Sequence, residues 1–396
     1  MSAAVTTTST LFSREFRLVV LGAWLFFLGF GASLPVLPRF VVDVLGRGEA
    51  AVGAVFAFYA LAAVLARPLI GRIGDRSGRR ILVLGGAALT GVALIGHLVA
   101  TSLTLLIVVR IVAGAGQAAV IVGLSTLALD LAPAHRHGEA ASYVMVATQL
   151  GMGIGPLVGE TLLGLGSYPL VWLAAAAGSL GAGALALALA HDHGSAVLVA
   201  RGLIHPAAWR PGIVLGLGVL GFIGFLAFVP LYAPQLGVTR VASLFLLCSG
   251  TIALVRVGGA RLPDRFGAIP GASVALTLLA VGSITVGMAG AAWALYAGTL
   301  LLAAGTAVVA PSLVLAAVQG IAHDERARVM ATITMFLDIA SAAGPAALGL
   351  VAATAGYRPT FLLAGGSAVL ALGLLRWWLA PRLRGSVAVP APATVG

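Results

Sequence analysis

The chain has 396 residues, of which 60% are hydrophobic and only 9% are charged, and its formal net charge is +11. A water-soluble protein of this composition would expose large apolar patches, so these numbers exclude a soluble globular domain and indicate a chain that lies mostly in lipid. The basic residues occupy short turns between apolar runs instead of one continuous face, so the charge does not indicate binding to nucleic acid.

Twelve apolar stretches are long enough to cross a membrane as helices, which takes about 20 residues each. The sequence therefore predicts an all-α integral membrane protein with twelve transmembrane helices in two pseudo-symmetric six-helix bundles. The spans of the first bundle (17–190) are predicted near 17–38, 50–70, 81–100, 103–131, 140–166 and 168–190. The spans of the second bundle (212–380) are predicted near 212–234, 241–259, 271–290, 292–317, 329–353 and 357–380. The remaining segments are predicted as an N-terminal tail (1–16), a linker (191–211) and a C-terminal tail (381–396).

The basic residues are divided unevenly between the two sides of this predicted membrane protein. All of them are arginines, and most lie in the turns that share a side with both termini. The opposite side carries only Arg39, Arg47, Arg240 and Arg358. By the positive-inside rule, we expect a multi-pass protein of the cell (cytoplasmic) membrane, with the arginine-rich turns and both termini in the cytoplasm.

A polar decapeptide, Gly71–Arg80, separates the second and third spans, and a weaker copy with Asp264 and Arg265 follows at an offset of 189 residues. Other features recur at the same offset: Arg67 with Arg256, Gly116 with Gly305, Gly155-Pro156 with Gly344-Pro345, and Tyr168 with Tyr357. The shared register indicates a duplicated six-span unit in parallel orientation. It predicts a substrate path between the two halves, near the middle of the bilayer.

These features resemble the major facilitator superfamily over essentially the full length of the chain. The decapeptide is similar to the family's signature between the second and third spans, and Arg110 with Gly114 and Gly116 is similar to its fourth-span signature. The turn after the fourth span resembles the family's charged turn through Asp130, Pro133, Arg136 and Glu139. The fifth span resembles the motif of drug:proton antiporters through Gly151, Gly155, Pro156 and Gly159, with Glu160 in place of the second glycine of its closing pair.

The charged turns are predicted to form a cytoplasmic gate. We expect Gly71 and Gly78 to let helix ends approach closely or turn sharply, and Asp75 to accept hydrogen bonds from arginines or from a helix N-terminus of the other half. A contact made in only one conformation would act as a latch for alternating access. The alternative is a basic turn that sets topology, in which Asp75 satisfies only local arginines. The predicted gate residues are Gly71, Asp75, Arg76, Gly78, Arg79, Arg80, Asp130, Arg136, Asp264 and Arg265.

Proline inside a helix removes a backbone hydrogen bond and bends the helix. Gly155-Pro156 lies in the fifth span and recurs as Gly344-Pro345 in the eleventh, with Gly151 and Gly159 close to the first copy. This recurrence predicts a bend at the interface between the two halves.

Three ionisable residues inside the spans are candidates for proton coupling. Arg110 lies within the fourth span, where an arginine costs roughly 2.5–3.5 kcal/mol, so it must face the bundle or water; it could couple protons, contact substrate, or bond to backbone carbonyls. Asp338 lies roughly 14 Å deep in the eleventh span, where burial favours a protonated carboxyl, and the alternative is a permanently protonated or arginine-paired structural group. Glu160 lies near the outer end of the fifth span, where a solvated rim residue is the alternative. Possible cavity residues are Gln117, Gln149, Tyr59 and Tyr232.

The leading interpretation is a secondary transporter that exports a small, largely apolar compound by proton antiport. The alternatives are an uptake carrier, a sugar or metabolite efflux carrier, and a non-transporting membrane sensor. A phosphate-binding loop, a His-box and metal-spaced histidines are all missing from the sequence, and Cys248 is the single cysteine. We therefore expect no enzymatic activity, cofactor or metal. The expected partners are a small-molecule substrate, protons and the lipid bilayer, without nucleic acid, and the chain is expected to be a monomer.

Overall fold

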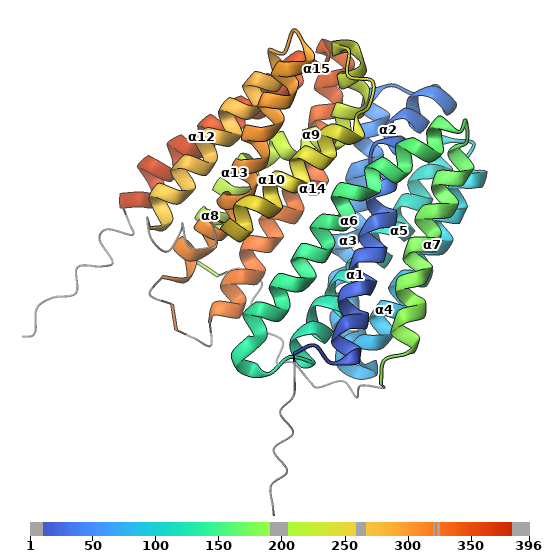
Figure 1. Ribbon diagram of the computed structural model, residues 1–396. Helices are drawn as coiled ribbons and strands as arrows, with labels where there is room; N and C mark the ends of the chain where they lie inside the picture. Colours follow the sequence, from blue (N-terminus) through green and yellow to red (C-terminus); the bar gives the residue numbers. More distant parts are fainter. Residues whose placement is uncertain (1–10, 191–204, 259–266, 320, 323–324, 382–396) are drawn as a thin grey trace, which may run out of the picture.

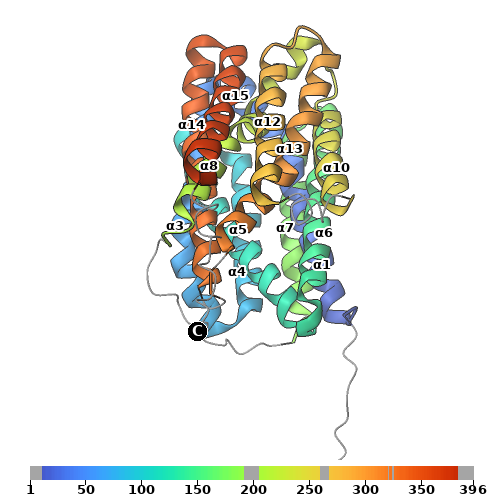
Figure 2. The same ribbon diagram turned by 90° about the vertical axis from the view of Figure 1, so that its left-hand side faces the viewer.

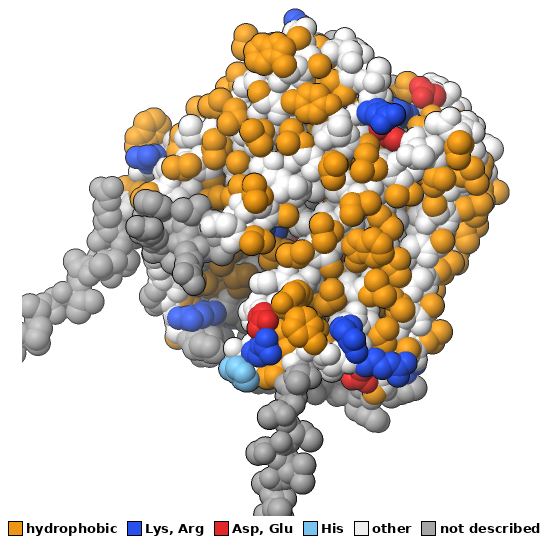
Figure 3. All heavy atoms as spheres, in the orientation of Figure 1, with side chains coloured by type: hydrophobic (Ala, Val, Ile, Leu, Met, Phe, Trp, Pro, Cys, Tyr) orange, Lys and Arg blue, Asp and Glu red, His pale blue; other side chains and the backbone are white. Residues whose placement is uncertain are grey.

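The structure is a computed structural model that describes residues 11–190, 205–258, 267–319, 321–322 and 325–381. Within these ranges every regular element is helical, and eleven helices are long and apolar enough to cross a membrane. A further apolar helix of the described ranges, α10 (Ala242–Gly258), has 17 residues. Together these helices lie at the twelve predicted positions, so the prediction of an all-α membrane fold is confirmed. On the face that Figure 3 shows, apolar side chains cover most of the surface, while most charged ones lie toward the ends of the helices.

The first half of the chain begins with α1 (Arg14–Ser33), which continues through α2 (Val36–Arg39) into the π-helix η1 (Phe40–Val44). It goes on with α3 (Glu49–Ser77), α4 (Arg79–Gly96), η2 (His97–Val99), α5 (Leu103–Asp130), η3 (Ala134–Arg136), α6 (His137–Gly164) and α7 (Tyr168–Leu187). Several spans extend beyond their predicted ends, and α3 includes most of the decapeptide.

The second half consists of α8 (Trp209–Gly218), α9 (Leu220–Tyr232), η4 (Ala233–Leu236), α10, α12 (Ala268–Gly287), α13 (Ala292–Val318), α14 (Arg326–Ala355), α15 (Tyr357–Leu374) and η5 (Leu375–Leu379). Helix α8 starts three residues before the predicted seventh span, so the last residues of the predicted linker are helical. Residues 191–204 of that linker lie outside the described ranges.

Figures 1 and 2 show α1 to α7 packed as one bundle and α8 to α15 packed as a second bundle beside it. Because each bundle has an even number of crossings, α1 begins and η5 ends on the same side of the molecule. We call this the terminal side and the opposite one the distal side. Glu49 and Tyr357, which begin α3 and α15, therefore lie at the distal side.

The duplication is visible in the backbone at the end of each motif copy. Gly78 precedes α4 with φ +87°, and Gly267, its counterpart in the register, precedes α12 with φ +88°. Glycine adopts this region at no steric cost, whereas other residues are strained there. The predicted sharp turn at Gly78 is thus confirmed.

The glycines of the fifth span pack inside the first bundle. A Cβ atom added at Gly151, Gly155 or Gly159 would come closer than 3.0 Å to the backbone of α1. These glycines therefore let α6 lie directly against α1 and do not face the other half. The prediction that the motif faces the interface between the halves is wrong for these three glycines, although α6 itself contacts α10 of the second half. Helical spacing shows which residues share a face but not what that face meets.

Candidate functional site

A cavity of about 270 Å³ lies between the two bundles. Its walls come from α1, α3 and α5 of the first half and from α9 and α14 of the second half. The residues that line it are Phe30, Leu34, Phe56, Tyr59, Ala60, Ala63, Arg67, Arg110, Gln117, Ala118, Ile121, Val122, Ile223, Leu226, Asp338, Ser341 and Pro345. Five predicted site residues thus meet in one space: Tyr59, Arg110, Gln117, Asp338 and Pro345. The volume is near the lower end of the range for small-molecule pockets, roughly 300–1,000 Å³.

Arg110 is the charged group buried deepest in the wall, with a side chain only 3% exposed. Its guanidinium carbon lies 3.9 Å from the centre of the Tyr59 ring and 5.9 Å from that of Phe56. Tyr59 is held in turn by a hydrogen bond from its hydroxyl to the Gln117 side-chain oxygen. Within the described ranges Arg110 forms no ion pair, and its Nε has no hydrogen-bond partner.

Burial of this charge is energetically unfavourable unless something compensates for it. Removing a guanidinium from water costs several kcal/mol, and a desolvated cation–π contact returns about 2 kcal/mol. A buried lysine can lose its proton and become neutral, but an arginine keeps its charge, so the cost of burial remains. The prediction that Arg110 faces the bundle is confirmed, and its contacts are aromatic faces, not the backbone carbonyls of the structural alternative.

Asp338 forms an ion pair with Arg67 across the two halves, at the end of the cavity nearer the terminal side. Arg67 Nη2 donates a hydrogen bond of 2.9 Å to Asp338 Oδ1, and its Nη1 lies against the second carboxylate oxygen. The Asp338 side chain is 16% exposed and that of Arg67 is 43% exposed. The arginine-paired arrangement, named as an alternative from the sequence, is therefore the one that this conformation contains.

The second half contains a related arrangement without the acid. Arg256, the counterpart of Arg67 in the register, reaches across to α6, where its Nη1 lies 3.0 Å from the sulfur of Met145. Met145 is one helical turn from Gln149, the counterpart of Asp338. Each half thus sends an arginine to the fifth helix of the other half, but only one of the two meets a carboxylate.

The distal side of the interface is closed by direct contact of α3 with α14. A Cβ atom at Gly53 would come closer than 3.0 Å to the carbonyl oxygen of Pro345, and Gly349 lies against the same stretch of α3. At the same level the Tyr357 hydroxyl donates a 2.8 Å hydrogen bond to Glu49. Within the described ranges, hydrogen bonds and ion pairs between the halves are confined to the distal side and to the level of Arg67 and Arg256.

Glu160 joins the halves at the distal side. Its carboxylate accepts hydrogen bonds from the backbone N–H groups of Val241, at 3.0 Å, and Ala242, at 2.9 Å, where α10 begins. Arg39 Nη2 of the first half lies 3.4 Å from the same carboxylate. A carboxylate on a helix N-terminus is stabilised by the helix dipole and by charge-assisted hydrogen bonds. Glu160 is therefore a closing contact between the bundles and not only a solvated rim residue.

We predict that Glu160→Gln loosens the distal closure. The variant keeps the shape of the side chain and loses its charge, so the closed arrangement should lose about 1 kcal/mol, or roughly fivefold in population. The measurement is maleimide labelling of Ala242→Cys, a fully buried position, in a Cys248→Ser background. Glu139→Gln serves as the control because Glu139 pairs with Arg136 inside the first half. Equal labelling rates with and without Glu160→Gln would contradict the assignment.

The predicted gate residues make contacts inside the first half. Arg79 Nε lies 2.9 Å from Asp130, and Arg80 donates hydrogen bonds of 3.0 and 2.8 Å to the carbonyls of Ala186 and Leu187, which end α7. Arg136 pairs with Glu139, whose hydrogen bond raises the pKa of that arginine. These contacts stabilise the terminal ends of the first bundle.

The latch predicted at Asp75 is not formed with any described residue in this conformation, and Arg76 is exposed. Asp264 and Arg265 lie outside the described ranges, so their predicted role as a weaker counterpart stays a prediction. The expected close approach at Gly71 is wrong: it lies inside α3, and a Cβ atom there would meet nothing within 4 Å.

Two predicted cavity residues do not line this cavity. Tyr232 is 3% exposed and packs against Phe361 and Tyr357 within the second half, with its hydroxyl 3.4 Å from the Ala289 carbonyl. Gln149 lies on α6, which contributes no residue to the wall of this cavity. Of the second bend motif, Gly344 faces Leu220 and Ile223 of α9, while Pro345 lines the cavity, so this copy does reach the interface.

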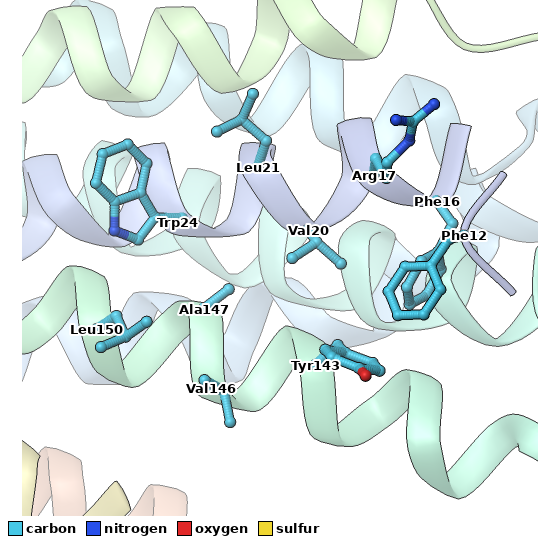
Figure 4. Close-up of a pocket in the computed structure, with 10 residues that line it drawn as sticks. All are labelled: Phe12, Phe16, Arg17, Val20, Leu21, Trp24, Tyr143, Val146, Ala147 and Leu150. Carbon is cyan, nitrogen blue, oxygen red and sulfur yellow. The ribbon is translucent and has the colours of Figure 1, made fainter. Parts of the chain in front are cut away.

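A second hollow, of about 330 Å³, lies between α1 and α6 and shares no residue with the cavity (Figure 4). It is lined by Phe12, Phe16, Arg17, Val20, Leu21, Trp24, Tyr143, Val146, Ala147 and Leu150. None of the predicted site residues lines this second hollow.

Comparison with known proteins agrees with this architecture. The family model of the Major Facilitator Superfamily matches residues 19–291 and 259–394, which together include nearly the whole chain. The chain belongs to the major facilitator superfamily. It is similar to the MFS-type transporter YhhS of Escherichia coli (strain K12), with 29% identity over 371 residues that cover 90% of each chain.

Two solved structures share the fold of this major facilitator protein. A bacterial homologue of the human lysosomal transporter Spinster, in an inward-facing and occupied conformation, has a TM-score of 0.78 at 16% identity and covers 95% of this chain and 98% of its own. The human organic anion transporter MFSD10 has a TM-score of 0.67 at 21% identity, over 92% of this chain and 100% of its own. The chain is therefore a multi-pass membrane transporter at the level of the family.

Sequence reasoning missed several functional contacts of this major facilitator protein. Arg67 appeared in the repeat register, but its partner lies 271 positions away and in the other half. Glu49 and Tyr357 are also joined only by the docking of the bundles. The aromatic wall of Phe30 and Phe56 carried no signal, because aromatic residues in apolar spans are more often packing residues.

Proposed function

We propose that the protein exports a small, largely apolar compound by proton antiport through alternating access. The observation that carries this proposal is the cavity between the halves, which direct helix contact closes on the distal side and the Arg67–Asp338 pair bounds toward the terminal side. A site between two bundles can be exposed to either side by rocking one bundle against the other. The arginine bias supports an orientation in the cell membrane in which the terminal side, with both termini, faces the cytoplasm.

The composition of the wall supports an apolar substrate. Apolar side chains from both bundles form most of the lining, and its uncharged polar groups are those of Tyr59, Gln117 and Ser341. Tyr59 and Gln117 already bond to each other, and the Ser341 hydroxyl donates to the Leu337 carbonyl of its own helix. A sugar would need many more hydrogen-bonding groups, so this wall disfavours the sugar alternative.

Asp338 supports the proton coupling. In the present conformation its carboxylate is held by Arg67, and these two residues belong to α14 and α3 of different halves. Movement of one bundle against the other would separate them and leave a carboxyl without its partner inside the membrane. A carboxyl group in that setting is more stable with a proton bound, so the motion and the protonation would occur together.

Efflux from inverted membrane vesicles tests the proposal. A proton gradient is imposed on vesicles that contain the protein, and a panel of fluorescent dyes and antibiotics is added outside. The accumulation of each compound inside the vesicles is measured with and without a protonophore. We expect accumulation of at least one apolar compound that the protonophore abolishes. Accumulation that is insensitive to the protonophore would reject proton antiport. Transport only in right-side-out vesicles would favour an uptake carrier, and binding without transport would favour a sensor. MFSD10, of the same fold, is named as a carrier of organic anions, so the panel should include acids.

A further inference from the structure

The side chain of Arg110 lines the cavity, and its guanidinium has hydrogen-bonding capacity that no described residue uses. Its face lies over Tyr59, with the central carbon 3.9 Å from the ring centre. A cation–π contact uses only the face of a guanidinium, and the N–H groups point outward in its plane, in a fork that fits a carboxylate. Within the described ranges these N–H groups meet no carboxylate, and Nε is buried without a partner.

The cavity wall as a whole has an excess of one positive charge. Its charged residues are Arg110, Arg67 and Asp338, and the last two neutralise each other. A cationic compound in this cavity would meet an uncompensated arginine. A neutral compound would displace water from that arginine without replacing its hydrogen bonds. An anion removes both penalties because it supplies the missing acceptor and the missing charge.

The rest of the wall fits the body of such a compound. Phe30 stacks on Tyr59 with ring centres 6.0 Å apart, and Phe56 lies near the same guanidinium. Ile223 and Leu226 of α9 form part of the opposite wall. An acidic group on Arg110 would therefore extend from an aromatic or branched aliphatic body enclosed between the halves.

We propose that the substrate class is small organic monoanions, with one carboxylate or sulfonate bound by Arg110 and an apolar body held by the aromatic wall. The statement that these anions are substrates rests on the proposed transport function. Their binding to Arg110 requires neither a proton gradient nor movement of the bundles. The inference narrows the proposed substrate class from largely apolar compounds to apolar compounds with a single acidic group.

Binding of matched compounds to the purified protein tests the assignment. Each set contains a carboxylate, its amide and the corresponding amine on one apolar body: 4-phenylbutyrate, 4-phenylbutanamide and 4-phenylbutylamine, and likewise the 1-naphthylacetate set. Affinities are measured by calorimetry and by the shift in Tm. We expect the carboxylate to bind at least about tenfold more tightly than its amide, since a charge-assisted pair is lost in the amide, and the amine to bind most weakly.

Variants locate the preference. Arg110→Gln should bind carboxylate and amide equally, and Arg110→Lys should retain part of the preference because it keeps the charge but not the fork. Arg256→Gln is the matched control: it removes a half-buried arginine that lies off the cavity, and any shift between conformations would change both affinities alike and leave their ratio unchanged.

The wild-type protein alone can overturn the proposal, so a failure of Arg110→Gln to fold does not prevent the test. The proposal is wrong if no carboxylate of the sets binds more tightly than its amide, or if the preference persists in Arg110→Gln. Efflux that ignores a protonophore would reject the antiport mechanism and leave this binding result intact. Equal binding within the sets would reject the monoanion class and leave the antiport mechanism intact.

Discussion

Asp338→Asn is expected to abolish the dependence of transport on the proton gradient. The amide keeps the size of the side chain but can neither bind a proton nor neutralise Arg67, whose guanidinium now donates a hydrogen bond to the carboxylate across the halves. Efflux from inverted vesicles should become insensitive to a protonophore, and accumulation against the gradient should fall by more than about tenfold. Asp43→Asn is the control, because Asp43 accepts a hydrogen bond from Tyr168 outside the cavity and should leave coupling unchanged.

The partner of Asp338 gives a second readout that does not depend on transport. Arg67→Gln leaves a carboxylate that is 16% exposed without its counterion. Breaking a fully buried pair costs about 3–5 kcal/mol, and because the Arg67 side chain is 43% exposed to solvent we expect about 2 kcal/mol here. The double variant Arg67→Gln with Asp338→Asn should recover most of this loss, which makes a double-mutant cycle in Tm informative.

Two results would contradict this account of Asp338. The first is Asp338→Asn that still accumulates substrate with the wild-type response to the protonophore. The second is a double variant whose loss in stability equals the sum of the two single losses, because independent sites add whereas paired charges do not.

The sequence predicted the helices well because the signal for them is local. Twenty apolar residues between arginine-rich turns define a span without knowledge of its neighbours, and the depth of Arg110 and Asp338 followed from counting along a helix. The register also predicted corresponding positions in the two halves, such as the paired glycines Gly78 and Gly267. In each case the prediction needs only the sequence of one helix, or the offset between the two halves.

Contacts between helices were predicted poorly because they depend on how the bundles dock. The glycine face of Gly151 and Gly155 was assigned to the interface and instead meets α1, and Tyr232 was assigned to a cavity and instead lies in a core. Helical periodicity groups residues on a face, but six helices can be arranged so that any given face meets protein, cavity or lipid. For the same reason, the sequence did not show which residue pairs with Asp338.

The distal closure is expected to be disrupted by a single methyl group. In Gly53→Ala the new Cβ atom would overlap the carbonyl oxygen of Pro345, so α3 and α14 cannot keep their present separation. Overpacking of this kind costs typically 1–3 kcal/mol, and because the two helices belong to different halves the cost falls on the closed arrangement alone. We therefore expect the distal side to open, with labelling of Ala242→Cys faster by about tenfold or more.

Two other glycines show whether the effect comes from the interface. Gly159→Ala makes a similar overlap with Ala32, but inside the first bundle, so it should lower Tm without exposing the distal side. Gly71→Ala meets nothing within 4 Å, so it should leave the labelling rate unchanged and should not lower Tm. If Gly53→Ala instead lowers Tm as Gly159→Ala does and leaves the labelling of Ala242→Cys at the wild-type rate, α3 and α14 do not separate during transport. Their contact would then be a fixed part of the fold, and the opening that alternating access requires would have to occur elsewhere along the interface.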